Sequence, residues 1–314
     1  MSILLTADFT DAEWAAWWPA LRAALPGETL LRDGSDLTGP ELAEVEIALV
    51  ANPPQGLLAR LPRLRLIQSL WAGVDRLLAD ASLPRDVPLA RMVDPVMSEA
   101  IAETALWAVL SLHRDHFDYA AQQRRREWRQ RPQRRADEVA VAVLGLGEMG
   151  RAAARRLAGN GYRVTGWCTR PVELSGITTR SGATALAPVL GQADVVVNLL
   201  PLTPATQGLF GRSTFAQMRR GASLVNLARG GHVIEPDLLL ALATGQLRHA
   251  VLDVFGSEPL APDHGFWTHP QVSVLPHIAA LTDPRSAAQV VARNVNAFRS
   301  GAPLAHLVDR ARGY

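Results

Sequence analysis

The chain has 314 residues, of which 48% are apolar and 20% are charged, and its 32 basic and 30 acidic residues give a formal net charge of +2. This length predicts two domains, and this composition excludes a wholly disordered chain. Every basic residue is an arginine, which excludes a Schiff-base lysine, a P-loop lysine and a lysine general acid. The single cysteine, Cys168, excludes an intramolecular disulfide and a multi-cysteine zinc site.

The N-terminal third alternates short apolar runs with helical patterns. Strands are expected at 3–7, 45–51 and 64–70. Helices are expected at 11–25, 57–61 and 74–79. This alternation predicts a mainly parallel, doubly wound sheet. The first residues lack the basic start and long apolar stretch of a signal peptide, and we expect no apolar run of the roughly 18 residues that cross a bilayer. A soluble, reduced, cytoplasmic protein without a membrane partner is therefore expected.

A long helix is expected next, from about 97 to 128, because its core lacks glycine and proline. It runs into seven arginines between Arg124 and Arg135, and Pro132 is expected to end the helical character. This cluster could be a nucleic-acid or anion patch, or a solvated helix end and loop. We favour the solvated end and expect no nucleic-acid partner, because no nucleic-acid motif accompanies it. His113 and His116 show no metal-ligand partners, so they are interpreted as structural residues of this helix, and no metal is expected.

A second α/β unit is expected to begin at Val139, as a strand, a glycine-rich turn, a helix and another strand. Further strands are expected at 194–199, 223–227, 249–254 and 272–275, with helices at 235–244 and 284–300. The turn has the pattern G-x-G-x-x-G, formed by Gly145, Gly147 and Gly150. Between a strand and a helix, this pattern predicts a dinucleotide site.

Each glycine of the turn has a distinct expected role. Gly145 permits the tight turn, Gly147 lets the backbone approach a pyrophosphate, and Gly150 lets the helix pack closely on the strand. Glu148 and Met149 complete the turn, and the helix N-terminus attracts the phosphate charge.

The end of the following strand distinguishes the two nicotinamide dinucleotides. NAD enzymes usually carry an acid there, which binds the ribose 2′-hydroxyl. This chain has Cys168 at that position, followed by Thr169 and Arg170. A hydroxyl and a guanidinium suit a 2′-phosphate, so the sequence predicts NADP(H), with NAD as the alternative.

Three side chains lie at or just beyond the expected ends of later strands: Arg229, Glu258 and His277. Ligands bind at that edge of an open α/β sheet. An arginine can bind a carboxylate bidentately, and a histidine can protonate a carbonyl oxygen as hydride arrives. A glutamate beside that histidine favours the imidazolium form. Together they predict the reduction of a 2-keto acid.

Four separated motifs carry a family resemblance: the glycine-rich turn, NLARG at 226–230, LDVF-x-x-EP at 252–259 and PHIA at 276–279. In this order they resemble the D-isomer-specific 2-hydroxyacid dehydrogenases, over nearly the whole chain. Within the family the chain is most similar to the glyoxylate/hydroxypyruvate reductase A branch, through Arg91–Asp94 with Met97, Asn198–Pro201 and the PHIAA ending.

The resemblance implies two doubly wound parallel-sheet domains, with a Rossmann-like coenzyme domain inserted in a flavodoxin-like substrate domain. It implies a substrate domain at 1–99 and 283–314, an NADP-binding domain at 100–282, and a homodimer. Arg229 matches the substrate-binding arginine, His277 the acid/base and Glu258 its carboxylate partner. The resemblance assigns the remaining contacts as follows: a substrate loop at Trp71, Ala72, Gly73 and Val74, a coenzyme loop at Leu200, Pro201 and Thr203, and an acid near the nicotinamide at Asp253.

The expected activity is hydride transfer from NADPH to a small 2-keto acid, such as glyoxylate or hydroxypyruvate, giving a D-2-hydroxy acid. One alternative is another member of the family, such as a phosphoglycerate dehydrogenase. Another is a non-catalytic dinucleotide-sensing protein, like the transcriptional corepressors that share this fold. The filled positions Arg229, Glu258 and His277 favour chemistry over sensing.

Overall fold

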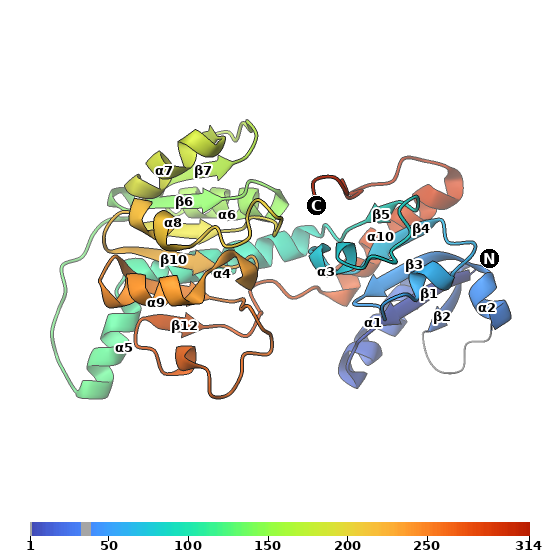
Figure 1. Ribbon diagram of the computed structural model, residues 1–314, viewed down its shortest axis with the longest axis horizontal. Helices are drawn as coiled ribbons and strands as arrows, with labels where there is room; N and C mark the ends of the chain where they lie inside the picture. The colour runs from blue at the N-terminus through green and yellow to red at the C-terminus, as the bar shows by residue number, and fades with distance from the viewer. Residues whose placement is uncertain (1, 33–38) are drawn as a thin grey trace. The chain divides into compact units, whose positions relative to one another are not determined.

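The computed structural model of the chain describes residues 2–32 and 39–314. The chain divides into two compact units, Met1–Val96 with Thr282–Tyr314, and Met97–Leu281 (Figure 1). Each unit is built on one sheet whose paired strands all run parallel. The predicted α/β class is therefore confirmed.

The first unit contains a five-stranded sheet of order β2-β1-β3-β4-β5, which is the flavodoxin-like order. Its strands are β1 (Ser2–Ala7), β2 (Thr29–Arg32), β3 (Val45–Ala51), β4 (Leu66–Ser69) and β5 (Leu89–Ala90). Its helices are α1 (Asp11–Ala24), α2 (Gly39–Ala43), α3 (Asp75–Leu78), α10 (Pro284–Ser300) and the 3₁₀ turn η1 (Leu58–Arg60).

Helix α1 begins where the sequence provides a capping box. The hydroxyl of Thr10 accepts the N–H of Glu13, and the Glu13 carboxylate accepts the N–H of Thr10. From there, Trp14, Trp17 and Leu21 fall on the buried face, which packs against α10 and one face of the sheet. Alternate residues of β1 and β3 serve the opposite face, so both faces of this sheet are covered.

The second unit contains a seven-stranded sheet of order β12-β11-β10-β9-β6-β7-β8, which extends the Rossmann order. Its strands are β6 (Ala140–Leu144), β7 (Arg163–Cys168), β8 (Thr178–Ser181), β9 (Val195–Asn198), β10 (Ala222–Asn226), β11 (Leu247–Leu252) and β12 (Val272–Val274). Its helices are α4 (Pro95–His113), α5 (His116–Arg125), α6 (Glu148–Gly159), α7 (Ala183–Gln192), α8 (Arg212–Gln217) and α9 (Glu235–Ala243), with 3₁₀ turns η2 (Ala136–Glu138), η3 (Gly230–His232) and η4 (Gly265–Trp267).

The central strands of this second sheet are apolar on both faces. In β6, Val141 and Val143 join the cluster that α4 and α6 complete, whereas Ala142 and Leu144 join the cluster that α7, α8 and α9 complete. A parallel strand covered on both faces is expected to be a continuous apolar run. Because these two layers of helices cover both faces of the sheet, only the ends of its central strands remain uncovered.

The single long helix expected from 97 to 128 is wrong. Two helices, α4 and α5, occupy this stretch, and Asp115 between them adopts a left-handed backbone with φ of 56°. Helical character ends at Arg125 rather than near Pro132, because Arg126 is also left-handed, with φ of 58°. His113 and His116 therefore lie on different helices, and His113 is bonded to the Tyr162 hydroxyl at 3.0 Å.

Helix α4 also corrects the expectation about membrane-spanning length. It has 19 residues and a mean hydropathy of 1.2, which by length and composition alone would allow it to cross a bilayer. Its buried residues, including Ile101, Ala105 and Val109, pack into the core beside β6. This core packing accounts for its apolar composition.

The burial of His249 in β11 leads us to predict that the protein loses stability in acid. Its side chain is buried against Phe117, with ring centroids 4.3 Å apart. Burial, helped by Arg248 and His269 and opposed by Asp118, lowers its pKa from 6.5 to about 4. The unfolded chain therefore binds an extra proton between these values, so this stabilisation is complete above pH 6.5 and is lost as the pH falls towards 4.

Between neutral pH and about pH 4, this histidine should cost the protein up to about 3 kcal/mol of unfolding free energy. Urea unfolding of His249→Gln should show a correspondingly smaller acid loss than wild type. His116→Gln, at an exposed position, is the matched control and should follow wild type. An equal acid loss in His249→Gln and wild type would contradict the prediction.

Candidate functional site

The carboxyl ends of the parallel strands of the second sheet meet at one edge. There β6 leads into the glycine-rich turn, β7 ends at Cys168, and β9 to β12 lead into the loops that carry the remaining predicted residues. The strand order reverses between β6 and β9, which are neighbours in the sheet. Ligands bind beside such a reversal in open α/β sheets.

The glycine-rich turn joins β6 to α6 and has the close contacts that its sequence predicts. Gly145 has φ of 95°, and a Cβ there would lie 2.6 Å from the Leu199 carbonyl oxygen. A Cβ on Gly150 would lie 1.7 Å from the Gly145 carbonyl oxygen. Gly147, the N-cap of α6, has no atom within 4 Å of such a Cβ among the described residues. Two glycines therefore permit the turn, and the third leaves room for a phosphate group.

The end of β7 combines a thiol with two cations. Cys168 is half-buried, and its Sγ–H donates to the Arg170 carbonyl at 2.8 Å. Burial raises the pKa of the Cys168 thiol, while the positive charges of Arg151 and Arg170 oppose that rise. Thr169 and Arg170 are exposed beside it. No carboxylate is at position 168 to bind a ribose hydroxyl.

Arg151 is a candidate that the sequence reasoning missed. It lies in the first turns of α6, and its Nε donates to the Leu146 carbonyl at 2.9 Å within the glycine-rich turn. Its charge acts on Cys168 in the same direction as that of Arg170. The signal in the sequence was an arginine directly after the last glycine of the motif.

A buried pair of asparagines links the loops after β9 and β10. The Asn198 amide donates to Asn226 Oδ1 at 2.9 Å, and both side chains are fully buried. Asn198 also accepts the N–H of Leu200, while Asn226 donates to the Arg229 carbonyl at 3.0 Å. The pair was not singled out from the sequence, although both residues lie within quoted motifs.

His232 reinforces this link, and it too was missed. It is fully buried, with one ring nitrogen 3.1 Å from the Arg229 carbonyl and the other 3.2 Å from the Pro201 carbonyl. The Pro201 carbonyl also accepts the Thr206 hydroxyl, which in turn accepts the N–H of Thr203. Hydrogen bonds between its own residues, and to His232, therefore hold the predicted coenzyme loop in place.

Arg229 follows β10 in an extended conformation and is half-buried. Its NH1 donates to the Ala228 carbonyl at 2.7 Å. The next residue must be glycine, because a Cβ on Gly230 would lie 1.9 Å from the Phe255 carbonyl carbon. That close approach brings the exit of β10 against the exit of β11.

Glu258 and His277 form the predicted pair. Nδ1 of His277 lies 2.6 Å from Oε2 of Glu258, and the other carboxylate oxygen accepts the N–H of Phe255 at 2.8 Å. Because an ionised carboxylate only accepts, the proton of this bond lies on Nδ1, and Nε2 is left for a further partner. Half of the His277 side chain is exposed, so solvent or a ligand can reach it.

Asp253 is buried beside the loop that carries His277. Its carboxylate accepts the N–H groups of Ile278 at 2.7 Å and Ala279 at 3.1 Å. Burial raises the pKa of Asp253, and the two N–H bonds and His277 oppose that effect. The family resemblance implies an acid near the nicotinamide here, and the geometry adds a structural role in the His277 loop.

The remaining predicted loop lies in the first unit, at the carboxyl end of β4. Ser69 Oγ accepts the N–H of Trp71 at 3.1 Å and donates to its carbonyl at 3.0 Å. The Trp71 ring packs edge-on against Phe9 and Trp17. Ala72, Gly73 and Val74 follow and lead into α3.

No metal centre is found in residues 2–32 and 39–314, where no three His, Cys, Asp or Glu side chains group as metal ligands.

Comparisons with known proteins place these residues in context. The family described as D-isomer specific 2-hydroxyacid dehydrogenase, NAD binding domain, matches residues 106–279. The chain is 37% identical to a glyoxylate/hydroxypyruvate reductase A of Serratia proteamaculans, over the whole of both chains. The family resemblance carried by the four motifs is therefore confirmed.

The chain is also similar to solved structures of proteins described in the same terms. A D-isomer specific 2-hydroxyacid dehydrogenase from Xanthobacter autotrophicus, in complex with NADPH and MES, is 38% identical with a TM-score of 0.94, covering 100% of this chain and 99% of that one. An NADPH-dependent glyoxylate/hydroxypyruvate reductase from Sinorhizobium meliloti, in complex with NADP and sulfate, is 36% identical with a TM-score of 0.94 over all of both chains.

The contacts of the turn predict that only one of two glycine substitutions destabilises the protein. Gly150→Ala places a methyl group against backbone, so urea unfolding should show a loss of at least about 2 kcal/mol. Gly147→Ala meets open space at an ordinary φ of −71° and should unfold like wild type. Equal stability of the two variants would contradict the packing described here.

Proposed function

Because the chain belongs to the D-isomer-specific 2-hydroxyacid dehydrogenase family, we propose that it uses NADPH to reduce a small 2-keto acid, such as glyoxylate or hydroxypyruvate, to a D-2-hydroxy acid. The observation that carries the proposal is the 2.6 Å bond between His277 and Glu258, at the strand edge where Arg229 also lies. These groups are sufficient to bind a carboxylate and to protonate a carbonyl oxygen.

In this mechanism the guanidinium of Arg229 binds the substrate carboxylate and polarises the adjacent carbonyl. His277, held through Nδ1 by Glu258, donates the proton on Nε2 to the keto oxygen. The carboxylate of Glu258 stabilises the imidazolium that must be present before this transfer. The nicotinamide, when bound, supplies the hydride that the keto carbon receives.

The coenzyme preference rests on the end of β7. Arg170 and Arg151 offer guanidinium groups suited to the 2′-phosphate of NADP, and Cys168 replaces the acid that would bind a free 2′-hydroxyl. The open space above Gly147 and the N-terminus of α6 suit the pyrophosphate. Relatives solved with NADPH or NADP support the same preference.

We extend the proposal to the remaining predicted contacts. The second unit is the coenzyme domain, with Leu200, Thr203 and Asp253 near the nicotinamide half. The first unit is the substrate domain, whose loop at 71–74 offers the N–H groups of Gly73 and Val74 to the substrate carboxylate. The homodimer and the cytoplasmic location remain predictions.

Substitution at the two central residues should separate proton transfer from substrate binding. His277→Gln should lower kcat by roughly a hundredfold to ten-thousandfold, because the proton donor is lost. Arg229→Gln should in addition raise KM for the keto acid by about tenfold or more. NADPH oxidation at 340 nm with glyoxylate, hydroxypyruvate and other 2-keto acids measures both.

Arg220→Gln, at an exposed arginine of the same unit, should retain wild-type constants. Near-wild-type kcat in His277→Gln would refute the mechanism. Tight NADPH binding without turnover on any 2-keto acid would instead favour a dinucleotide-sensing protein.

The coenzyme proposal has its own test. Arg170→Ala should raise KM for NADPH by roughly tenfold or more and leave KM for NADH unchanged, because only NADPH carries the 2′-phosphate. Arg151→Gln should act in the same direction. Arg155→Ala, at an exposed position of α6, is the control. Equal efficiency of NADH and NADPH in the wild type would contradict the assignment.

A further inference from the structure

One fully buried histidine lies between two loops of the candidate site. His232 ends the 3₁₀ turn η3, and its side chain is shielded from solvent. Its Nδ1 lies 3.1 Å from the carbonyl oxygen of Arg229, and its Nε2 lies 3.2 Å from that of Pro201. Arg229 is the predicted substrate-binding arginine, and Pro201 belongs to the predicted coenzyme loop. A single ring therefore contacts the main chain of both.

Each ring nitrogen of His232 faces an acceptor. A carbonyl oxygen only accepts, and a neutral imidazole carries one N–H, so the neutral ring donates to one carbonyl and only the imidazolium donates to both. In either form the ring fills the space between the two carbonyl groups, because buried side chains are closely packed. A displacement of one carbonyl group therefore acts on the other through this ring.

Main-chain bonds join the same two segments beside the histidine side chain. The N–H of Gly208 donates to the Gly231 carbonyl at 2.9 Å, and the N–H of Phe210 donates to the His232 carbonyl at 2.8 Å. A Cβ on Gly231 would lie 3.1 Å from the side chain of Leu202, so the two segments are also in close contact there. These contacts hold η3 against the coenzyme loop and the residues that follow it.

The buried asparagine pair gives a second connection between the two loops. Asn198 accepts the N–H of Leu200 at 3.2 Å and donates to Asn226 at 2.9 Å. Asn226 in turn donates to the Arg229 carbonyl at 3.0 Å. Two routes from the coenzyme loop, one through His232 and one through the asparagines, therefore end on the same oxygen. That oxygen belongs to the main chain from which the Arg229 side chain extends.

We propose that His232 is a positioning residue that couples coenzyme binding to substrate binding. Through its ring, the coenzyme loop in its occupied state fixes the main chain of Arg229 in the position that binds the substrate carboxylate. The inference rests on the proposed function, which assigns the two loops their roles. Such coupling is reciprocal, so substrate and coenzyme raise each other's affinity by the same factor.

The coupling is measured as a ratio of two dissociation constants for NADPH, determined by calorimetric titration of the full chain without and with saturating oxamate. Oxamate carries a carboxylate beside an amide carbonyl and is not reduced, so it probes the substrate site without turnover. The wild type should bind NADPH about tenfold more tightly with oxamate present. His232→Phe keeps a buried ring but removes both nitrogens, and it should lower this ratio at least about threefold.

Two further substitutions distinguish lost coupling from a damaged fold. In His232→Asn the amide nitrogen lies near the position of Nδ1 and can retain the bond to Arg229, whereas in His232→Gln it lies near that of Nε2 and can retain the bond to Pro201. The carbonyl that loses the ring keeps another donor, the Thr206 hydroxyl or the Asn226 amide. Both variants should therefore unfold close to the wild-type temperature and still show the lowered ratio.

Steady-state kinetics give a second measurement of the same coupling. In the three His232 variants, KM for the keto acid at saturating NADPH should rise by about the factor by which the ratio falls. The change in kcat should be smaller, because the bond between His277 and Glu258 is untouched. A loss confined to kcat would contradict a positioning role.

His269→Gln is the matched control, because His269 lies in the turn before β12, where its Nδ1 accepts the N–H of Gln271 at 3.2 Å. It should keep the wild-type ratio. Equal ratios in the wild type and His232→Phe, or a wild-type ratio of one with normal turnover, would overturn this inference and leave the proposed function standing. A wild type that neither binds NADPH nor reduces any 2-keto acid would refute the proposed function, and this inference with it.

Discussion

One buried carboxylate holds the part of the chain on which the site depends. Asp253 binds three successive backbone N–H groups. Its main-chain carbonyl accepts that of His277 at 2.9 Å, and its carboxylate accepts those of Ile278 and Ala279. His277 has φ of 54°, a left-handed conformation that is unfavourable for any residue but glycine. These bonds sustain that conformation, which in turn brings Nδ1 to Glu258. The hydroxyl of Thr104 on α4 binds the Ala279 carbonyl and fixes the end of the same loop.

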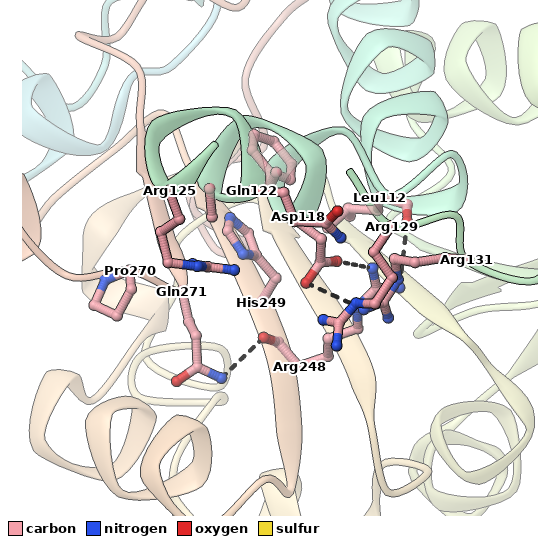
Figure 2. A pocket seen from close by; sticks show the side chains of 12 residues that line it. Leu112, Asp118, Gln122, Arg125, Arg129, Arg131, Arg248, His249, Pro270 and Gln271 are labelled. Atoms are coloured by element: carbon pink, nitrogen blue, oxygen red, sulfur yellow. Dashed lines mark hydrogen bonds and ion pairs between the residues drawn. The ribbon is translucent and has the colours of Figure 1, made fainter. Parts of the chain in front are cut away.

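The two ends of the parallel strands carry different kinds of groups within one unit. At the carboxyl ends of the strands, loops carry Arg229, Glu258 and His277 together with the glycine-rich turn. At the other end of the strands, where β11 begins, Arg248 instead forms ion pairs with Asp115 and Asp118 at the start of α5, and Figure 2 shows the pair with Asp118. Because both faces of the sheet are covered by helices, the residues assigned to the reaction lie in loops at the ends of the strands.

The sequence predicted the central strands and the chemistry-bearing motifs, because both have strong local signals. Buried parallel strands such as β3 and β9 are apolar runs, and the glycine-rich turn is a short pattern whose Gly150 packs against Gly145 within the same motif. The three strands that it missed, β2, β5 and β8, all lie at sheet edges, where they are short or only partly buried.

Long-range interactions account for the other errors. The break after α4 follows from Asp115, whose carboxylate pairs with Arg131 and Arg248, and no local pattern encodes those partners. The Asn198–Asn226 pair likewise joins residues of two strands that only the sheet brings together.

The absence of lysine has a consequence for how the strand exits respond to pH. Apart from the histidine, every cationic side chain named there is a guanidinium, which stays protonated throughout the working range of an enzyme. Proton-dependent behaviour at the strand exits must therefore come from the histidine, thiol and carboxyl groups. There, His277 is accessible whereas Asp253 is buried. Elsewhere in the unit, His249 in β11 stays neutral until the pH approaches 4. Arginine thus makes anion binding at the strand exits nearly independent of pH.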